Sequence, residues 1–165
     1  MHNKKGFTLI EAMVVICLFA LISTLAIMQL SFLDEIIARS QMDKLAAVCS
    51  YLRQKAIATN SEQKLIFDLE KNEYHCGDMR ETLPQRYSFG FMEKALGPPG
   101  SPSQKIKKAI TFPGNIIHFY PTGIISSGTV YVVDKKKQYM YALSNAVSQF
   151  SYLRIYRYEG KWKLL

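Results

Sequence analysis

The segment Lys4-Lys5-Gly6-Phe7-Thr8-Leu9-Ile10-Glu11 and the apolar run after it decide the fold. That run extends from Ala12 to Leu33, and none of its 22 residues is charged. At about 1.5 Å per residue, a helix of this length crosses the apolar core of a bilayer. Lysines precede the run and Asp34-Glu35 follow it, so the positive-inside rule keeps the N-terminus in the cytoplasm and exports the remainder.

Glu11 is an acidic residue in an otherwise apolar segment. An ionised carboxylate costs about 2.5–3.5 kcal/mol near the bilayer centre and less near an interface, so it needs a counter-charge. Cleavage between Gly6 and Phe7 would give Phe7 a positive α-amino group. That amine lies one helical turn from Glu11, and it could equally pair with the Glu11 of an adjacent subunit. Pairing between subunits would also favour one register, because a displaced charge would lie unpaired in lipid.

These eight residues resemble the class III signal of type IV pilins and pseudopilins. The resemblance implies that residues 1–6, with Lys4 and Lys5, are a leader that a prepilin peptidase removes after Gly6. It implies N-methylation of Phe7 by the same peptidase/N-methyltransferase and docking of Glu11 in a filament of other pilin or pseudopilin subunits. The expected location is the bacterial inner membrane, with one span and an exported C-terminal domain. A plain single-pass membrane anchor is the alternative interpretation.

The helix pattern continues beyond the apolar run. Neither Pro nor Gly occurs between Phe7 and Cys76, which predicts one helix from Phe7 to about Asn60. Leu45, Val48, Cys49, Leu52 and Ala56 form one apolar stripe at helical spacing. Many filament-building relatives interrupt this helix with Pro or Gly, so its continuity favours a minor subunit.

After the helix, the hydrophobic period changes to two. Strands are predicted at 64–69, 73–76, 86–92, 109–112, 116–119, 129–134, 138–144, 150–158 and 161–164. The expected fold class is α+β, pilin-like: a long N-terminal helix packed on an antiparallel β-sheet or small β-sandwich. The first half of the helix is transmembrane and the second half amphipathic. The expected organisation is a leader at 1–6, a membrane helix at 7–33 and an exported domain at 34–165.

A second resemblance narrows the family. Phe119-Tyr120-Pro121-Thr122-Gly123 and the later Ser127-Gly128-Thr129 are similar to the turn and strand entry of the pseudopilin H (GspH/FimT-like) family. That family contains minor pseudopilins of type II secretion systems and minor pilins of type IV or DNA-uptake pili. The resemblance therefore implies a structural subunit of a pseudopilus or pilus.

Positive charge is concentrated in the last part of this 165-residue chain, whose formal net charge is +8. Residues 34–100 carry 9 basic and 10 acidic side chains, whereas residues 101–165 carry 10 and 2. The last strands interleave aromatic residues with Arg154, Arg157, Lys161 and Lys163, which predicts DNA binding in a competence pilus as the alternative function. Lys105, Lys107 and Lys108 form another basic patch after the loop at 97–102. For both groups, a merely solvated basic face is the other interpretation.

The sequence contains no catalytic or metal-binding motif that we recognise. No Ser-His-Asp or Cys-His spacing, P-loop, HExxH or CxxC occurs, so we expect neither an enzyme nor a cofactor or metal. Cys49 and Cys76 would both be exported and could form a disulfide. Alternatively, Cys49 is simply a core residue, because it lies on the apolar stripe.

Overall fold

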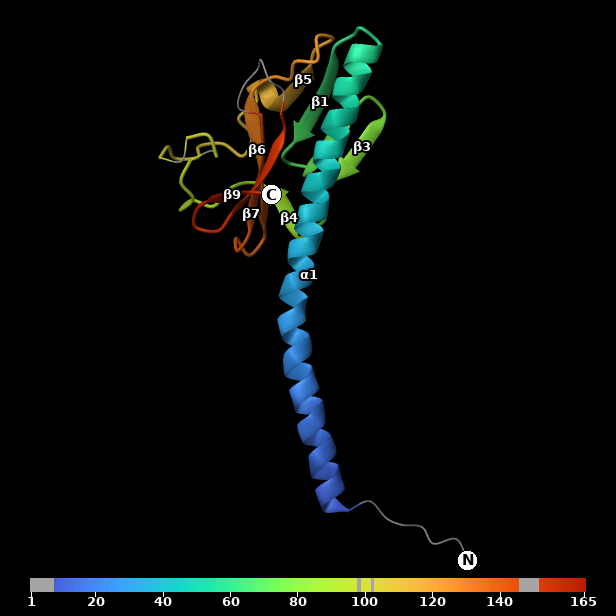
Figure 1. Cartoon of the computed structure of the whole chain (residues 1–165), viewed down its shortest axis with the longest axis vertical. Helices are drawn as coiled ribbons and strands as arrows, with labels where there is room; N and C mark the ends of the chain where they lie inside the picture. Colours follow the sequence, from blue (N-terminus) through green and yellow to red (C-terminus); the bar gives the residue numbers. More distant parts are fainter. Residues whose placement is uncertain (1–7, 98, 102, 146–151) are drawn as a thin grey trace, which may run out of the picture. The chain divides into compact units, whose positions relative to one another are not determined.

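The computed structural model describes residues 8–97, 99–101, 103–145 and 152–165, with the backbone alone for residues 25–35. The chain divides into two compact units, Met1–Ile37 and Ala38–Leu165. Helix α1 (Leu9–Ala58) contributes residues to both units (Figure 1). No helix among the described residues combines the length and the apolar character that crossing a bilayer requires.

Helix α1 ends in a Schellman motif. Asn60 adopts a left-handed conformation with φ 48°. The Asn60 amide donates to the Ile57 carbonyl at 3.3 Å, and the Ser61 amide donates to the Ala56 carbonyl at 3.2 Å. These two bonds satisfy carbonyl groups that the helix end would otherwise leave unpaired. The predicted helix end near Asn60 is confirmed.

The part of α1 that belongs to the C-terminal unit is amphipathic. Each residue of its buried stripe is at most 2% exposed; the stripe consists of Ala38, Met42, Leu45, Cys49, Leu52 and Ala56. These positions follow one another at three- and four-residue intervals, so they share one helix face. The stripe packs against the strands and confirms the predicted amphipathic second half of the helix.

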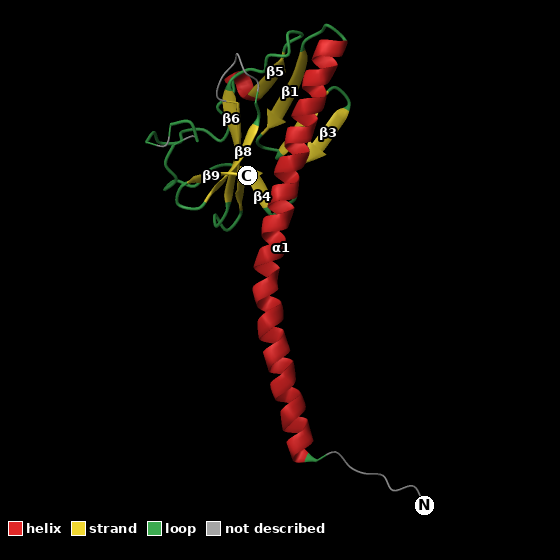
Figure 2. Cartoon of the chain, in the orientation of Figure 1, coloured by secondary structure: helices red, strands yellow, loops and turns green. Residues whose placement is uncertain are grey.

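Two antiparallel sheets follow the helix (Figure 2). The first has the order β3-β2-β1-β5, formed by β1 (Gln63–Asp68), β2 (Glu73–Cys76), β3 (Met79–Thr82) and β5 (Ile116–Phe119). The second has the order β4-β6-β7-β8-β9, formed by β4 (Tyr87–Phe89), β6 (Gly128–Asp134), β7 (Met140–Asn145), β8 (Arg154–Tyr158) and β9 (Trp162–Leu164). A 3₁₀ turn, η1 (Pro113–Asn115), precedes β5. The expected α+β class is confirmed.

The main core lies where α1 and both sheets meet. It combines the helix stripe with Leu65 and Phe67 of β1, Val130 and Val132 of β6, and Leu143 of β7. In β6, the alternate residues Tyr131 and Val133 belong to a second cluster instead. Because side chains alternate between the faces of a strand, β6 is buried on both sides.

The second cluster lies on the opposite face of the β4–β9 sheet. The segment 91–108 covers this face by burying Ala95 and Ile106 beside Tyr131 and Met140. The Trp162 indole N–H donates to the carbonyls of Leu96 at 3.1 Å and Gly97 at 2.7 Å. The segment after the predicted strand 86–92 is therefore attached to the sheet through one aromatic side chain.

Two strand boundaries differ from the predictions. The predicted strand 86–92 is reduced to β4, because the chain leaves the sheet after Phe89 to cover its outer face. The predicted strand 109–112 is a single bridge between Ile110 and Val130. It lies along the same edge of β6 as β4, and only two backbone bonds, Thr111 to Thr129 and Tyr131 to Ala109, hold it there.

Candidate assembly site and basic surface

The predicted processing site precedes the first described residue. Lys4, Lys5, Gly6 and Phe7 lie outside the described residues, which begin at Thr8. The cleavage and methylation assignments therefore stay predictions. The site can be followed from Thr8 onward, where the chain enters α1.

Thr8 and Glu11 form a capping box at the start of α1. The Thr8 amide donates to Glu11 Oε2 at 2.8 Å, and the Glu11 amide donates to Thr8 Oγ1 at 3.3 Å. The Thr8 hydroxyl also donates to Glu11 Oε2 at 2.9 Å. These bonds satisfy backbone donors that a helix start leaves unpaired. The Thr-x-x-Glu spacing was visible in the sequence, but the charge of Glu11 alone does not reveal this role.

The capping box occupies only half of the Glu11 carboxylate. Both bonds from Thr8 end on Oε2, and Oε1 accepts no hydrogen bond among the described residues. A carboxylate has two oxygens and about four lone-pair sites. Glu11 can therefore cap its own helix and bind a cation at the same time.

The first turns of α1 are apolar on every side. Large hydrophobic side chains from Leu9 to Ile22 are between 41% and 79% exposed: Leu9, Ile10, Met13, Val14, Val15, Ile16, Leu18, Phe19, Leu21 and Ile22. A helix that is hydrophobic all round needs an apolar environment, which lipid or other helices supply. The only carboxylate between Thr8 and Thr24 is Glu11.

Residues 1–27 match the family model described as the prokaryotic N-terminal methylation motif. The segment is a type IV pilin-like prepilin signal. The chain is thus a pilin-like subunit of the kind that a prepilin peptidase processes and that assembles with other pilin subunits. No curated protein and no solved structure matches the chain at a significant level.

Beyond the prepilin signal, the two glycines of the pseudopilin H-like segments have geometric roles. Gly123 has φ +80°, and its carbonyl accepts a bond from Arg53 Nε at 2.8 Å, which attaches the turn to α1. At Gly128, a Cβ would lie 2.6 Å from the Phe112 ring. Both positions therefore require glycine, one for its backbone conformation and the other for space.

The basic residues of the last strands do not share one face. Alternation along β8 places Arg154 on the face of Tyr156 and Tyr158, which pack on the second cluster. Arg157 lies on the opposite face and is paired in register with Lys163 of β9. Lys161 is exposed at the turn between the strands. The predicted row of four cations is therefore split.

Glu159 further reduces the positive charge of these strands. Its Oε1 lies 3.0 Å from Arg157 Nε, and its Oε2 contacts Lys163 Nζ. The hydrogen bond from Lys163, together with the charge of Arg157, lowers the pKa of the Glu159 carboxyl. Arg157 also lies over the Tyr139 ring, 5.4 Å from its centroid. DNA binding by Arg154, Arg157, Lys161 and Lys163 stays a prediction, while two of the four already have a carboxylate partner.

The two exported cysteines are free thiols in the structure. Cys49 is fully buried in the main core, and burial raises the pKa of its thiol to about 12. Cys76 is half-buried at the end of β2 and packs against the same core. The high thiol pKa makes Cys49 a poor nucleophile. A bond between the two cysteines stays a prediction.

Proposed function

We propose that the chain is a minor pseudopilin or pilin-like subunit of a type II secretion pseudopilus or type IV pilus. The observation that supports this most directly is the N-terminal methylation motif at residues 1–27. The similarity of residues 119–123 and 127–129 to the pseudopilin H (GspH/FimT-like) family supports the finer assignment. The subunit functions by assembly, and its chemistry is limited to its own maturation.

In this proposal, residues 1–6 are removed and Phe7 becomes the methylated N-terminus. Residues 7–33 span the inner membrane once with the N-terminus in the cytoplasm, and residues 34–165 lie outside the cytoplasm. Glu11 pairs through Oε1 with the Phe7 amine of its own or an adjacent subunit, while Oε2 remains in the capping box. Such a pair neutralises a charge that is costly to bury in lipid.

The continuous helix supports the assignment as a minor subunit. α1 runs from Leu9 to Ala58, and neither Pro nor Gly interrupts its sequence. A helix that loses its hydrogen bonds during assembly usually contains such a residue. We therefore propose that the N-terminal helix stays intact in the assembled state.

The test is the intact mass and N-terminal sequence of the chain, co-expressed with and without a prepilin peptidase. The proposal expects a chain that begins at methylated Phe7 only when the peptidase is present. A Gly6→Leu variant is the matched control, because it enlarges the residue before the cut and should stay uncleaved. A chain that still begins at Met1 in the presence of the peptidase would contradict the proposal and leave a plain membrane anchor.

A further inference from the structure

A groove lies between the segment 100–111 and the β4–β9 sheet, within the C-terminal unit. It consists of two hollows of about 660 Å³ and about 380 Å³ that share Thr111 as a lining residue. Three lysines line the larger hollow, and the hydroxyl-rich ends of β6 and β7 line the smaller one. We call this feature the loop–sheet groove. It is separate from the prepilin signal and from the four basic residues of β8 and β9.

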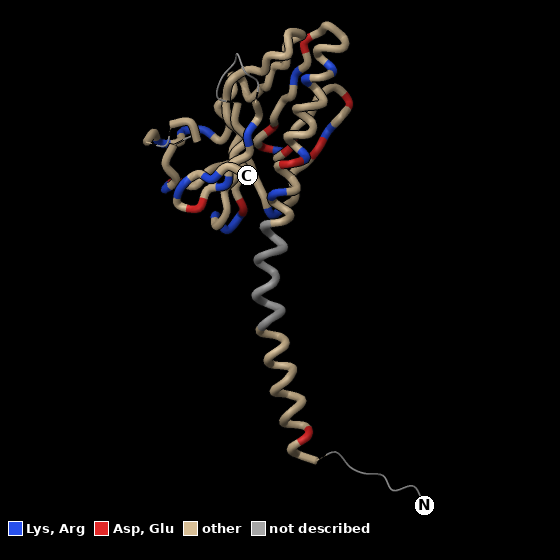
Figure 3. The backbone as a smooth tube through the Cα atoms, in the orientation of Figure 1, with Lys and Arg blue, Asp and Glu red and all other residues tan. Residues whose placement is uncertain are grey.

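The rim of the groove is positively charged and lacks bound carboxylates. Lys105, Lys107 and Lys108 are exposed, and none of them pairs with a carboxylate in the part of the chain that the structure describes. Lys44 and Lys163, by contrast, do have such partners, Glu81 and Glu159. Figure 3 shows the basic positions of this segment beside the sheet.

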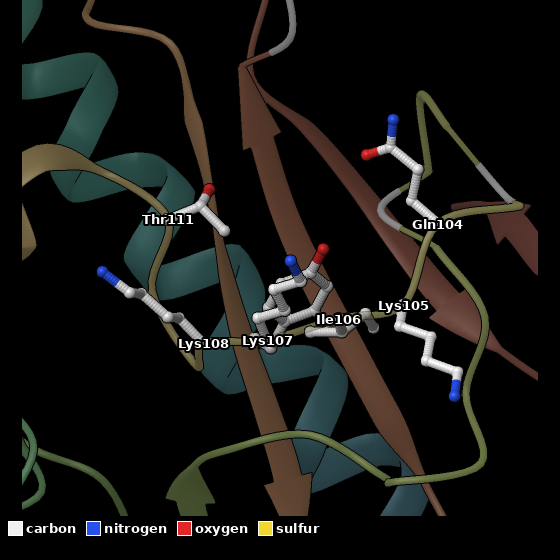
Figure 4. A pocket seen from close by; sticks show the side chains of 7 residues that line it. Gln104, Lys105, Ile106, Lys107, Lys108 and Thr111 are labelled. Atoms are coloured by element: carbon white, nitrogen blue, oxygen red, sulfur yellow. The ribbon is translucent and has the colours of Figure 1, made fainter.

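The three lysines are arranged for an extended ligand. In Figure 4, the side chains of Lys105 and Lys108 extend in opposite directions, and Lys107 lies between them. Their ammonium groups therefore do not converge on one point, as they would around a single small anion. Negative charges spaced along a chain would fit this arrangement better, because each could approach a different lysine.

Two buried polar atoms in the floor have no hydrogen-bond partner among the described residues: Asn145 Oδ1 and the Tyr131 hydroxyl. The Asn145 amide group donates to the carbonyls of Ile125 at 2.9 Å and Ser126 at 3.1 Å, which fixes its orientation. The Thr129 hydroxyl beside Tyr131 is already bonded to Ser144 at 3.0 Å. Leaving a buried polar group unpaired costs about 1–3 kcal/mol, so a ligand that pairs with it gains that amount.

These atoms also indicate what the ligand must carry. Asn145 Oδ1 can only accept, so the ligand needs an N–H or O–H donor as well as negative charge. The backbone of a nucleic acid carries phosphates but no N–H groups. A polypeptide has an N–H at nearly every residue, spaced about 3.3 Å apart along an extended strand, and its Asp and Glu side chains supply the charge. The buried side chain of Ile106 adds an apolar surface to the groove lining.

We propose that the loop–sheet groove binds an extended, acidic segment of another polypeptide. The carboxylates of this segment pair with Lys105, Lys107 and Lys108, and its backbone N–H groups donate toward Asn145 Oδ1. The Tyr131 hydroxyl supplies a further hydrogen bond at the floor. This interaction does not depend on cleavage of the N-terminus, so its failure and the failure of the assembly proposal are separate results.

The test uses the full-length chain in a neutral detergent and a fluorescein-labelled peptide that repeats Glu-Ala-Gly. Fluorescence anisotropy should show saturable binding that weakens with salt, and the same peptide with Gln in place of Glu should not bind. The variant K105E/K107E/K108E should lose affinity by about tenfold or more.

The matched control is K135E/K136E/K137E, which changes the net charge equally on an exposed hairpin. The Asp134 carboxylate holds this hairpin through the backbone amides of Lys136, Gln138 and Tyr139. The control should bind the peptide within about twofold of the unmodified chain. Equal losses in both triple variants would overturn the proposal, because only net charge would then matter.

A second variant tests the floor of the groove. Tyr131→Phe removes one unpaired hydroxyl and retains the ring, so the melting temperature should not fall, while peptide affinity drops about threefold to tenfold. Unchanged affinity would overturn the role of the hydroxyl. An acidic oligogalacturonate or a single-stranded oligonucleotide that displaces the peptide at a lower concentration would overturn the polypeptide assignment. Absence of saturable peptide binding would overturn the proposal as a whole.

Discussion

Glu11 is the residue on which both the helix start and the proposed assembly contact depend. Its Oε2 accepts from the backbone and the hydroxyl of Thr8, and Oε1 is left for a counter-charge. Separate oxygens mean that the two roles do not compete. They can therefore be separated by a substitution that retains the hydrogen bonds and removes the charge.

Glu11→Gln is that substitution, because Gln can also occupy the third helical position of a capping box. We expect normal cleavage by the peptidase, but incorporation into filaments should fall about tenfold or more, since the proposed charge pair is lost. The measurement is the fraction of the chain in sheared filaments, with the intact mass reporting cleavage. A Gln variant that assembles as well as the unmodified chain would show that capping alone is required.

Gly128 has a purely steric requirement. A Cβ at this position would lie 2.6 Å from the Phe112 ring, inside the main core. Gly128→Ala should lower the free energy of unfolding by about 1–3 kcal/mol through overpacking. Gly100→Ala is the control, because nothing lies within 4 Å of its Cβ. Urea unfolding followed by the fluorescence of Trp162, the one tryptophan, measures both; equal midpoints would contradict the steric explanation.

At the scale of whole elements, patterns of hydrophobic residues were the reliable predictors. The stripe on α1 and the alternation in β6 lie at the predicted positions because burial enforces their periods. β3 was not predicted, since Met79-Arg80-Glu81-Thr82 is a mostly polar edge strand without a buried face. The capping box was also missed, although its spacing is local and readable.

The candidate sites were predictable to different degrees. The prepilin signal is a contiguous motif, so sequence alone was sufficient to find it. The loop–sheet groove brings residues 105–108 beside Asn145, and no local pattern reports such a long-range approach. The pairing of Glu159 with Arg157 and Lys163 depends on the register of β8 with β9, which the sequence does not reveal.

The charge pairs on β8 and β9 lead to a prediction about DNA. If these strands bind DNA, Glu159→Gln should raise affinity, because it removes the carboxylate that neutralises Arg157 and Lys163. Two additional phosphate contacts would steepen the salt dependence by about two in the log–log slope. Anisotropy of a labelled duplex over a salt series measures this, with Glu93→Gln as an exposed control of equal charge. Identical slopes for both variants would argue against binding by these strands.

For the molecule as a whole, paired carboxylates determine the response to acid. His118 Nδ1 lies 2.5 Å from Glu62 Oε1, and this hydrogen bond lowers the pKa of Glu62. The Lys71 amide lowers the pKa of Asp68, and Lys163 lowers that of Glu159. A carboxyl whose folded pKa is depressed contributes stability above its unfolded pKa, about 4, and loses it as the pH falls through the folded value.

Urea midpoints should therefore be constant from neutral pH to about 5 and then fall as the solution becomes more acidic. The variant E62Q/D68N/E159Q should show a shallower fall, because these carboxyls no longer titrate. The measurement is again Trp162 fluorescence in urea, repeated over a series of buffers. An equally steep fall in the variant would assign acid sensitivity to other groups.

The main core has a consequence for the order in which the chain can fold. It joins Ala38 to strands as distant as β7, whose Leu143 is one of its fully buried residues. Ribosomes add about 5–20 residues each second, so the first turns of the core helix exist for several seconds before their partners do. During that interval the stripe on α1 has no sheet to cover it. Compact folding of this unit is therefore a late event, completed only after more than a hundred residues separating its contacts have been synthesised.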